Sequence, residues 1–233
     1  MEAIILAGGM GTRLQAVVRE LPKAMAPVAG RPFLYYLLET LEAAGFDHVI
    51  LAVGYRHEVI EEWLSAFSTR MRISLVVEEE PLGTGGAARL SLCQAEQPDV
   101  FILNGDTFFP VDYAAMLVSH REMGAEATLA LKEMRSATRY GLVELHNDAH
   151  IARFREKQTG ESGLINGGVY LIRREALRHY PDRFSLEKDY FEAVVGSKKL
   201  AGFLSGRYFL DIGIPEDYEQ ARKDFADGKY KTF

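Results

Sequence analysis

Apolar and polar positions divide the chain into two regions with different rhythms. In the first region, short runs of aliphatic and β-branched residues alternate with longer segments whose apolar residues recur at helical spacing. Strands that alternate with helices are typical of a mostly parallel sheet covered on both faces. The short runs predict buried strands at residues 3–7, 48–53, 73–77 and 100–103, and the longer segments predict helices at residues 33–41, 57–67 and 86–95.

The rhythm changes after about residue 125, where short apolar runs follow one another with little between them. These runs predict strands at residues 127–131, 142–145, 151–154, 169–172 and 208–210, and a final helix is expected at residues 215–226. We find no linker, low-complexity segment or internal repeat. The sequence therefore predicts a single α/β domain over residues 1–233, whose second half adds a mixed, substrate-covering part.

Composition narrows the classes of protein to which the chain can belong. It has 233 residues, of which 48% are hydrophobic and 26% charged, as in an ordinary globular domain. The net charge of −6, without a basic tail or stripe, argues against a nucleic-acid surface. No apolar run approaches the roughly 18 residues of a membrane span, and the start of the chain lacks the cations of a signal peptide. We therefore expect a cytoplasmic protein that binds neither nucleic acid nor membrane.

Cysteine and histidine usage excludes two further kinds of chemistry. The single cysteine, Cys93, cannot form an intramolecular disulfide, and its place in a predicted helix suggests a buried, unreactive thiol. The six histidines show no metal-ligand spacing, so zinc chemistry is not expected. We also find no nucleophile–base–orienter trio, so no covalent intermediate is expected.

Glycines and two cations follow the first predicted strand. In open α/β sheets, ligands bind at the carboxyl ends of strands, where glycines let backbone N–H groups turn toward an anion. Gly8, Gly9 and Gly11 with Arg13 therefore predict a phosphate site, although a tight strand-to-helix turn would also take glycine. A Walker A loop does not fit, because Gly-Lys-Ser/Thr is absent. A dinucleotide fingerprint does not fit either, because Leu14 stands where its third glycine should be.

Two aspartates end predicted strands in different halves of the chain. Asp106 follows the strand at 100–103, and Asp211 follows the strand at 208–210. Two carboxylates with phosphate oxygens and waters would suit Mg²⁺, whereas either aspartate alone would equally suit a turn or a cap. The chain contains no Asp-x-Asp, which counts against a glycosyltransferase that binds its metal through that motif.

The opening stretch and seven later segments resemble the sugar nucleotidyltransferases, the nucleotide-sugar pyrophosphorylases. LAGGMGTRL and PKAMAPV resemble the N-terminal signature of that family. The resemblance implies a Rossmann-like nucleotidyltransferase fold, with a mixed, mostly parallel central sheet flanked by helices and no C-terminal β-helix. Residues 1–125 would form the nucleotide-binding half and residues 126–233 the sugar-phosphate-binding half. The later segments are EEPLGTGGAA (79–88), LNGDTF (103–108), RYGLVEL (139–145), FREK (154–157), INGGVYLI (165–172), FSLEKD (184–189) and FLDIGIPEDY (209–218).

The resemblance also implies a reaction and a role for particular residues. A sugar 1-phosphate would attack the α-phosphorus of a nucleoside triphosphate and release pyrophosphate, a reaction governed by positioning and electrostatics. Arg13, Lys23 and Asp106 would be catalytic, with Asp106 and Asp211 as ligands of Mg²⁺. The nucleotide would contact Leu6, Ala7, Gly8, Gly9, Gly11, Thr12, Arg13, Glu80, Leu82, Gly83, Thr84 and Asp106. The sugar phosphate would contact Gly141, Glu156, Lys157, Asn166 and Gly167.

Within the family, NGDTFF, LINGG and DIGIPEDY are most similar to the short guanylyltransferases that act on D-glycero-α-D-manno-heptose 1-phosphate. This resemblance implies GTP and a sugar 1-phosphate as partners, GDP-heptose for bacterial surface polysaccharide as the product, and a homodimer or higher homo-oligomer. A mannose-1-phosphate guanylyltransferase and an amino-sugar 1-phosphate uridylyltransferase stay open as alternatives. A non-catalytic nucleotide-sugar sensor is a third, which the presence of Arg13, Lys23, Asp106 and Asp211 disfavours.

Overall fold

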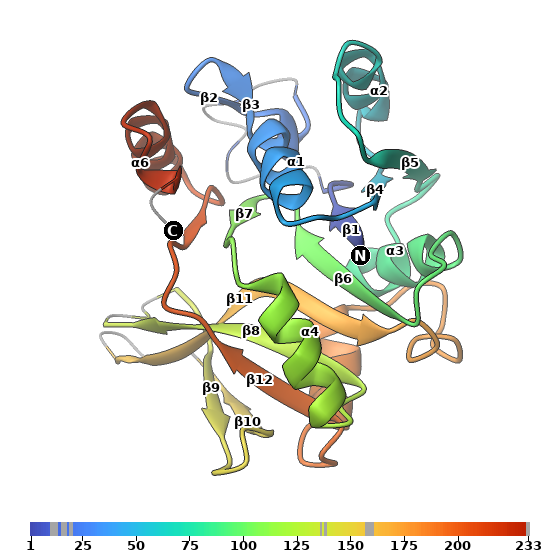
Figure 1. The fold of residues 1–233 in the computed structure, drawn as a ribbon, viewed down its shortest axis with the longest axis vertical. Helices are drawn as coiled ribbons and strands as arrows, with labels where there is room; N and C mark the ends of the chain where they lie inside the picture. The colour runs from blue at the N-terminus through green and yellow to red at the C-terminus, as the bar shows by residue number, and fades with distance from the viewer. Residues whose placement is uncertain are drawn as a thin grey trace.

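A nine-stranded sheet runs through the part of the chain that the structure describes. This computed structural model describes residues 1–9, 14, 18, 21–135, 137, 139–156 and 161–231. The main path of the sheet has the order β10-β9-β11-β6-β1-β4-β5, and β8 pairs with β11 while β12 pairs with β8 (Figure 1). The expected mixed sheet flanked by helices is confirmed, and the described residues contain no C-terminal β-helix.

Parallel strands form the first half of the sheet. Strand β1 lies between β4 and β6 and runs parallel to both, and β5 runs parallel to β4. All six residues of β4 are buried, as expected for a parallel strand with helices over both faces. These strands are β1 (Glu2–Leu6), β4 (His48–Val53), β5 (Arg72–Val77) and β6 (Asp99–Asn104).

The second half adds strands that are mostly antiparallel. Strand β11 runs antiparallel to β6 and so connects the two halves of the sheet. It also pairs antiparallel with β8 and with β9. Strand β12 runs parallel to β8. These strands are β8 (Ala127–Met134), β9 (Leu142–Leu145), β10 (Ile151–Arg155), β11 (Gly163–Arg173) and β12 (Leu200–Leu204).

Helices cover the two faces of the sheet and enclose two cores. Successive residues of β1 enter opposite cores: Ile5 packs in the core beneath α1, α2, α4 and α6, and Ile4 packs in the core beneath α3 and the π-helix η2. The helices are α1 (Phe33–Ala43), α2 (His57–Ser65), α3 (Gly83–Leu92), α4 (Tyr113–Glu122), α5 (Glu192–Val194) and α6 (Pro215–Ala226), with η1 (Lys23–Met25), η2 (Leu186–Phe191) and η3 (Lys229–Lys231).

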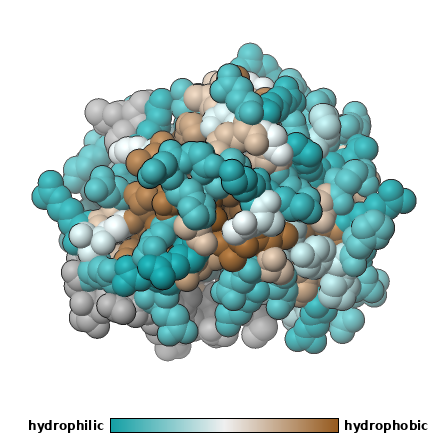
Figure 2. Space-filling view, turned by 90° about the horizontal axis from the view of Figure 1, so that it is seen from below, coloured by the Kyte–Doolittle hydropathy of each residue, from teal (hydrophilic) through white to brown (hydrophobic). Residues whose placement is uncertain are grey.

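Two small ladders complete the fold. Strand β2 (Pro27–Val28) pairs with β3 (Arg31–Pro32) beside α1. Strand β7 (Thr107–Phe108) pairs with β13 (Leu210–Asp211), which brings the end of the chain against the segment that follows β6. The surface seen from below is mostly hydrophilic, with hydrophobic residues gathered in its middle (Figure 2).

Most predicted elements are confirmed. The strand predicted at 208–210 is wrong in its bounds, since β13 spans Leu210–Asp211, and strand β12 was not predicted. The helix at 215–226 and the strand at 48–53 match the structure residue for residue. Helix α4 was not predicted, because an exposed Val118 and a buried His120 obscure its apolar stripe. The prediction of a buried Cys93 is wrong: α3 begins at Gly83 and ends at Leu92, and the thiol just beyond its end is exposed.

Candidate active site

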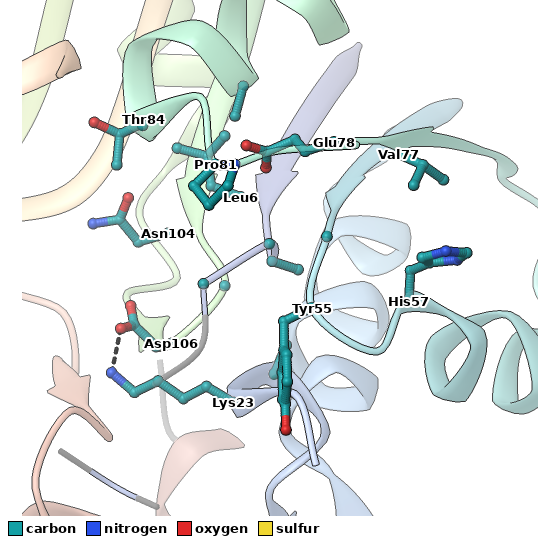
Figure 3. A pocket seen from close by; sticks show the side chains of 18 of the residues that line it. Leu6, Lys23, Tyr55, His57, Val77, Glu78, Pro81, Thr84, Asn104 and Asp106 are labelled. Carbon is teal, nitrogen blue, oxygen red and sulfur yellow. Dashed lines mark hydrogen bonds and ion pairs between the residues drawn. The ribbon is translucent and has the colours of Figure 1, made fainter. Parts of the chain in front are cut away.

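A cavity of about 870 Å³ opens at the carboxyl ends of the parallel strands (Figure 3). Segments that follow β1, β4, β5 and β6 supply most of its walls, as the position of ligands in open α/β sheets predicts. Other parts of the chain also contribute to the lining, namely Lys23, Ala24, Thr84, Ala87 and Gly213. The remaining lining residues are Leu6, Ala7, Gly8, Gly9, Gly54, Tyr55, His57, Val77, Glu78, Glu79, Glu80, Pro81, Gly83, Asn104, Gly105 and Asp106.

A close backbone approach fixes the floor of this cavity. The Gly105 N–H donates to the Leu6 carbonyl at 3.0 Å, so the turn after β6 is attached to the end of β1. A Cβ at position 105 would lie 2.7 Å from that carbonyl oxygen, which leaves space for glycine alone. Asp106, the next residue, is therefore positioned by backbone contacts.

Strand pairing brings Asp211 beside Asp106. In the β7–β13 ladder Asp211 lies opposite Thr107, and the Ile212 N–H donates to the Asp106 carbonyl at 2.9 Å. The Gly213 N–H donates to Asp211 Oδ1 at 2.6 Å and orients its carboxylate. The predicted metal ligands, from positions more than 100 residues apart, are thus neighbours.

Lys23 completes this cluster of charges. It begins the short helix η1 directly after Pro22, and the buried Ala24 and Met25 anchor that turn in the core. Its ammonium forms an ion pair with Asp106, and its side chain is 12% exposed (Figure 3). A lysine ammonium carries three N–H donors, so Lys23 can hold Asp106 and still donate to phosphate oxygens.

The electrostatics of the two aspartates suit a divalent cation. Burial raises the pKa of Asp211, the negative charge of Asp106 raises it further, and Lys23 lowers it. The charge of Asp106 therefore destabilises the ionised form of Asp211, and a cation between the two side chains would relieve that repulsion. Among the described residues no group of three His, Cys, Asp or Glu side chains could hold a metal. Two carboxylates with water and phosphate oxygens are a typical Mg²⁺ set, so the residues fit such an ion.

The structure places most of the predicted nucleotide residues around the cavity. Leu82 is not in the lining, because its N–H donates to Glu78 Oε2 at 3.1 Å and its carbonyl accepts from the Phe184 N–H at 3.1 Å. Gly11, Thr12, Arg13 and Lys157 lie outside the described residues. The predicted residues in the lining are Leu6, Ala7, Gly8, Gly9, Glu80, Gly83, Thr84 and Asp106.

In the acidic run Glu78–Glu80 after β5, the residue predicted to contact the nucleotide, Glu80, is not the most buried glutamate. Glu80 is exposed, whereas Glu78 is half-buried and reaches across to Gly8. Burial raises the pKa of Glu78, and the hydrogen bond from the Leu82 N–H partly offsets this. The sequence held a signal for Glu78, since it is the residue that directly follows the predicted strand at 73–77.

Packing against a later segment requires the glycines at the start of α3. A Cβ at Gly83 would lie 2.6 Å from the Phe184 carbonyl oxygen. A Cβ at Gly85 would overlap the Phe184 ring, and one at Gly86 would overlap the Asp182 carbonyl. Glycine at these positions thus lets the segment 182–184 pack against the helix.

Three of the residues predicted to contact the sugar phosphate lie side by side on neighbouring strands. Leu142 of β9 pairs with Ile165 of β11 and with Arg155 of β10. The next residues along these antiparallel pairings are Gly141, Asn166 and Glu156. The structure therefore brings these three together, and Glu156 is exposed there.

Asn166 stands at an irregularity of β11. The pairing with β8 shifts between Asn166 and Tyr170, and Gly168 has a φ of +70°. Such a bulge redirects a side chain, and the Gly168 N–H accordingly donates to Asn166 Oδ1 at 2.9 Å. Packing requires glycine at position 167, because a Cβ there would overlap the ring of Phe109, and the contact of Gly167 with the sugar phosphate stays a prediction.

Tyr140 connects the sugar side to the predicted metal site. Its hydroxyl lies 3.5 Å from Asp211 Oδ2, and its ring packs edge-on against Phe209. The neighbouring Arg139 forms an ion pair with Asp217 at the start of α6. Sequence reasoning had named Gly141 but not Tyr140, although both belong to the same RYGLVEL segment.

The fold and this site define a nucleotide-transferring enzyme, and comparison with known proteins agrees. The chain belongs to the Nucleotidyl transferase family, which it matches over residues 2–228. Members of this family generally use a divalent metal. The resemblance inferred from the sequence is thereby confirmed.

Particular relatives are similar over almost the whole chain. A D-glycero-alpha-D-manno-heptose 1-phosphate guanylyltransferase from Aneurinibacillus thermoaerophilus is 44% identical over 96% of this chain and 98% of its own. The enzyme of the same name from Campylobacter jejuni is 38% identical over 94% of this chain and 97% of its own. The crystal structure of HddC from Yersinia pseudotuberculosis, complexed with GMP-PN, has a TM-score of 0.87 and 34% identity, covering 96% of this chain and 99% of its own. In the described part of this chain, no helix is long and apolar enough to cross a membrane.

Proposed function

We propose that this chain transfers GMP from GTP to D-glycero-α-D-manno-heptose 1-phosphate, with Mg²⁺ as the metal, and releases pyrophosphate. The observation that supports this most directly is the cluster of Lys23, Asp106 and Asp211 beside the cavity. The near full-length similarity to two enzymes that carry this name supports the choice of nucleotide and sugar. The GDP-heptose formed would supply bacterial surface polysaccharide.

The reaction joins two anions, so charge neutralisation is the main task of the protein. A phosphate oxygen of the sugar phosphate attacks the α-phosphorus of GTP, and the bond from that phosphorus to pyrophosphate breaks. We assign Lys23 to both substrates, whose repulsion it would offset, because it lines the cavity and its ammonium has N–H donors beyond the one paired with Asp106. A divalent cation held by Asp106 and Asp211 would polarise the α-phosphate and stabilise the developing charge. Arg13, with Gly11 and Thr12, is proposed for the β- and γ-phosphates.

Recognition of guanine is assigned to Glu78 in place of Glu80. Guanine presents two adjacent donors, its ring N1–H and its exocyclic amino group, and a carboxylate can accept from both. Glu78 is half-buried in the cavity wall, and among the described residues the Leu82 N–H is its one hydrogen-bond donor. We propose its Oε1, which lies beside Gly8, as the oxygen that accepts from the base. Uracil and thymine each present a single such donor on this edge and would gain less from a carboxylate.

Pyrophosphate release with Mg²⁺ tests this proposal. GTP, ATP, CTP, UTP and dTTP are crossed with heptose-, mannose- and glucosamine-type 1-phosphates. The proposal expects the highest kcat/KM for GTP with the manno-heptose phosphate. A higher value with mannose 1-phosphate would keep the chemistry and overturn the sugar, and a preference for UTP would overturn the base. No release with any pair, from folded protein that binds nucleotide sugars, would favour a sensor.

Two parts of the proposal concern assembly and organisation. We keep the prediction of a homodimer or higher homo-oligomer, which light scattering on the purified protein tests. We also keep the division into a nucleotide-binding half at 1–125 and a sugar-phosphate-binding half at 126–233. The proposed contacts of Glu156, Asn166 and Lys157 with the sugar phosphate all belong to the second half.

A further inference from the structure

The carboxylate of Glu187 accepts hydrogen bonds from hydroxyl groups in separate parts of the fold. Glu187 belongs to the π-helix η2, and its Oε2 accepts from the hydroxyl of Thr84 at 2.7 Å and of Ser185 at 3.1 Å. Its Oε1 accepts from the hydroxyl of Tyr170 at 3.2 Å. Thr84 stands at the start of α3 and Tyr170 on β11, so Glu187 connects a helix that borders the cavity with a strand of the central sheet.

One end of this connection lies at the sugar side. Asn166 Nδ2 donates to the Tyr170 hydroxyl at 3.0 Å, and Asn166 Oδ1 accepts from the Gly168 N–H at 2.9 Å. Both ends of the amide are therefore held, which fixes the direction of this side chain. Tyr170 is 1% exposed, and burial followed by the charge of Glu187 raises its pKa, so it stays a neutral donor.

The other end lies at the nucleotide cavity. Thr84 lines that cavity (Figure 3), and its hydroxyl also accepts from the Leu186 N–H at 2.9 Å. The Phe184 carbonyl accepts from the N–H groups of Gly85 at 3.0 Å and Gly86 at 3.3 Å. The first turn of α3 is thus attached to the segment 184–187 by both backbone and side-chain bonds.

We propose that Glu187 is a positioning residue that couples the nucleotide cavity to the sugar side through Thr84, Tyr170 and Asn166. This inference rests on the proposed function, because it assigns the sugar to the Asn166 side. Glu187 accepts from both Thr84 and Tyr170, so an arrangement of Thr84 that holds this carboxylate in place also holds the Tyr170 hydroxyl and, through it, the Asn166 amide. Nucleotide binding that holds Thr84 in place therefore raises the affinity for the sugar phosphate.

Tyr170→Phe tests the connection with the smallest change of shape. It removes the hydroxyl between Asn166 and Glu187 and leaves Thr84 and its bond untouched. We expect the KM for the sugar phosphate to rise about fivefold to tenfold, the usual effect of one lost hydrogen bond. The Kd of GMP-PN alone and kcat should change less than threefold. The coupling factor, the ratio of the Kd of GMP-PN alone to its Kd with saturating sugar phosphate, should fall toward one.

Tyr190→Phe is the matched control, since Tyr190 is also a buried tyrosine and lies in the π-helix η2 that carries Glu187. Its hydroxyl donates to Glu126 Oε1 at 2.9 Å, and it forms no link between Thr84 and Asn166. It should lower the Tm by an amount similar to Tyr170→Phe and leave both KM values and the coupling factor unchanged. Ser185→Ala removes the third donor of Glu187 and should likewise leave the coupling intact.

Glu187→Gln provides a second disruption at the centre of the connection. An amide has one acceptor oxygen, so it cannot accept from all three hydroxyls as the carboxylate does. The same rise in the KM for the sugar phosphate and the same fall in coupling are expected. Unchanged KM and coupling in Tyr170→Phe, or equal changes in Tyr190→Phe, would overturn the inference while the unaltered enzyme stays active. No turnover by the unaltered enzyme with any sugar phosphate would overturn the proposed function, and the coupling with it.

Discussion

The proposed nucleotide side and the proposed sugar side of the site are built by different means. Around the cavity, residues are positioned by the ends of parallel strands and by backbone bonds, such as Gly105 N–H to the Leu6 carbonyl. On the sugar side, Asn166 is positioned by a bulge in β11 and by side-chain hydrogen bonds through Tyr170 and Glu187. The first construction therefore depends on backbone bonds, whereas the second depends on individual hydroxyl groups.

The charged cluster of Lys23, Asp106 and Asp211 lies between the proposed nucleotide side and the proposed sugar side. Asp106 follows β6, Asp211 comes from β13, and Tyr140 of the sugar side reaches Asp211. Substitutions here should therefore have the largest effects, because they affect both substrates. Substitutions within either side alone should be smaller and selective for one substrate.

The largest effect is expected from Asp106→Asn. The variant retains the shape of the side chain and removes the charge that we assign to the metal. Turnover should fall about a thousandfold, at the upper end for loss of one electrostatic stabiliser. Mn²⁺ binding to the protein, measured by calorimetry with GTP absent, should weaken as well. Asp112→Asn is the control, since Asp112 caps α4 by accepting from the Ala115 N–H and asparagine caps equally well. Full activity of Asp106→Asn would remove Asp106 from the metal site.

Lys23→Ala should follow, with a loss of about a hundredfold in kcat/KM. The lysine neutralises phosphate charge and also pairs with Asp106, so its removal leaves that carboxylate without its cation. We therefore expect slower turnover but tighter Mn²⁺ binding to the nucleotide-free protein. Lys229→Ala breaks the ion pair with Asp224 at the end of α6 and is the control. Weaker Mn²⁺ binding, or a loss of turnover below threefold, would contradict this account.

Glu78→Gln should act on the nucleotide side alone. Exchange of the carboxylate for an amide replaces an acceptor by a donor opposite the proposed guanine N–H groups. The KM for GTP should rise about 10- to 100-fold, as for a lost hydrogen bond to a charged group, while the KM for the sugar phosphate stays the same. Glu80→Gln, on an exposed glutamate of the same run, should change neither constant. A larger effect of Glu80→Gln would return the base contact to the residue first predicted from the sequence.

The comparison of the two sides also explains what could be predicted from the sequence. Strand ends are visible as the points where apolar runs stop, so Asp106, Asp211 and the glycines after β1 could be located in advance. Their meeting in space follows from the β7–β13 ladder, and strands of two residues leave no periodic pattern to detect. The family resemblance, rather than periodicity, supplied the pairing of the two aspartates.

The side-chain network on the sugar side left weaker signals. Tyr170 and Glu187 are 17 positions apart, and only the bulge at Gly167 and Gly168 turns Asn166 back toward the tyrosine. The π-helix that carries Glu187 has no pattern of its own in the sequence. The glycines of the first turn of α3 have a steric cause that the sequence does not show, because Gly83 and Gly85 accommodate Phe184 and Gly86 accommodates Asp182. Steric causes of this kind depend on which segment packs there, and a single sequence does not contain that information.

The smallest effects are expected in the free energy of unfolding. They are tested by substituting one glycine near the cavity, Gly105, and one in β11, Gly163. In Gly105→Ala the new Cβ would lie 2.7 Å from the Leu6 carbonyl oxygen, and a backbone obstacle cannot move aside. We expect a loss of about 1–3 kcal/mol in the free energy of unfolding, and a Tm lower by about 3–10 °C. In Gly163→Ala the nearest atom is a methyl group of Leu142 at 3.2 Å, which can rotate away, so the change should stay within about 0.5 kcal/mol. Thermal unfolding of both variants measures the difference. Equal losses would mean that the sugar side is as rigid as the backbone scaffold around the cavity, and that its positioning does not depend on side chains.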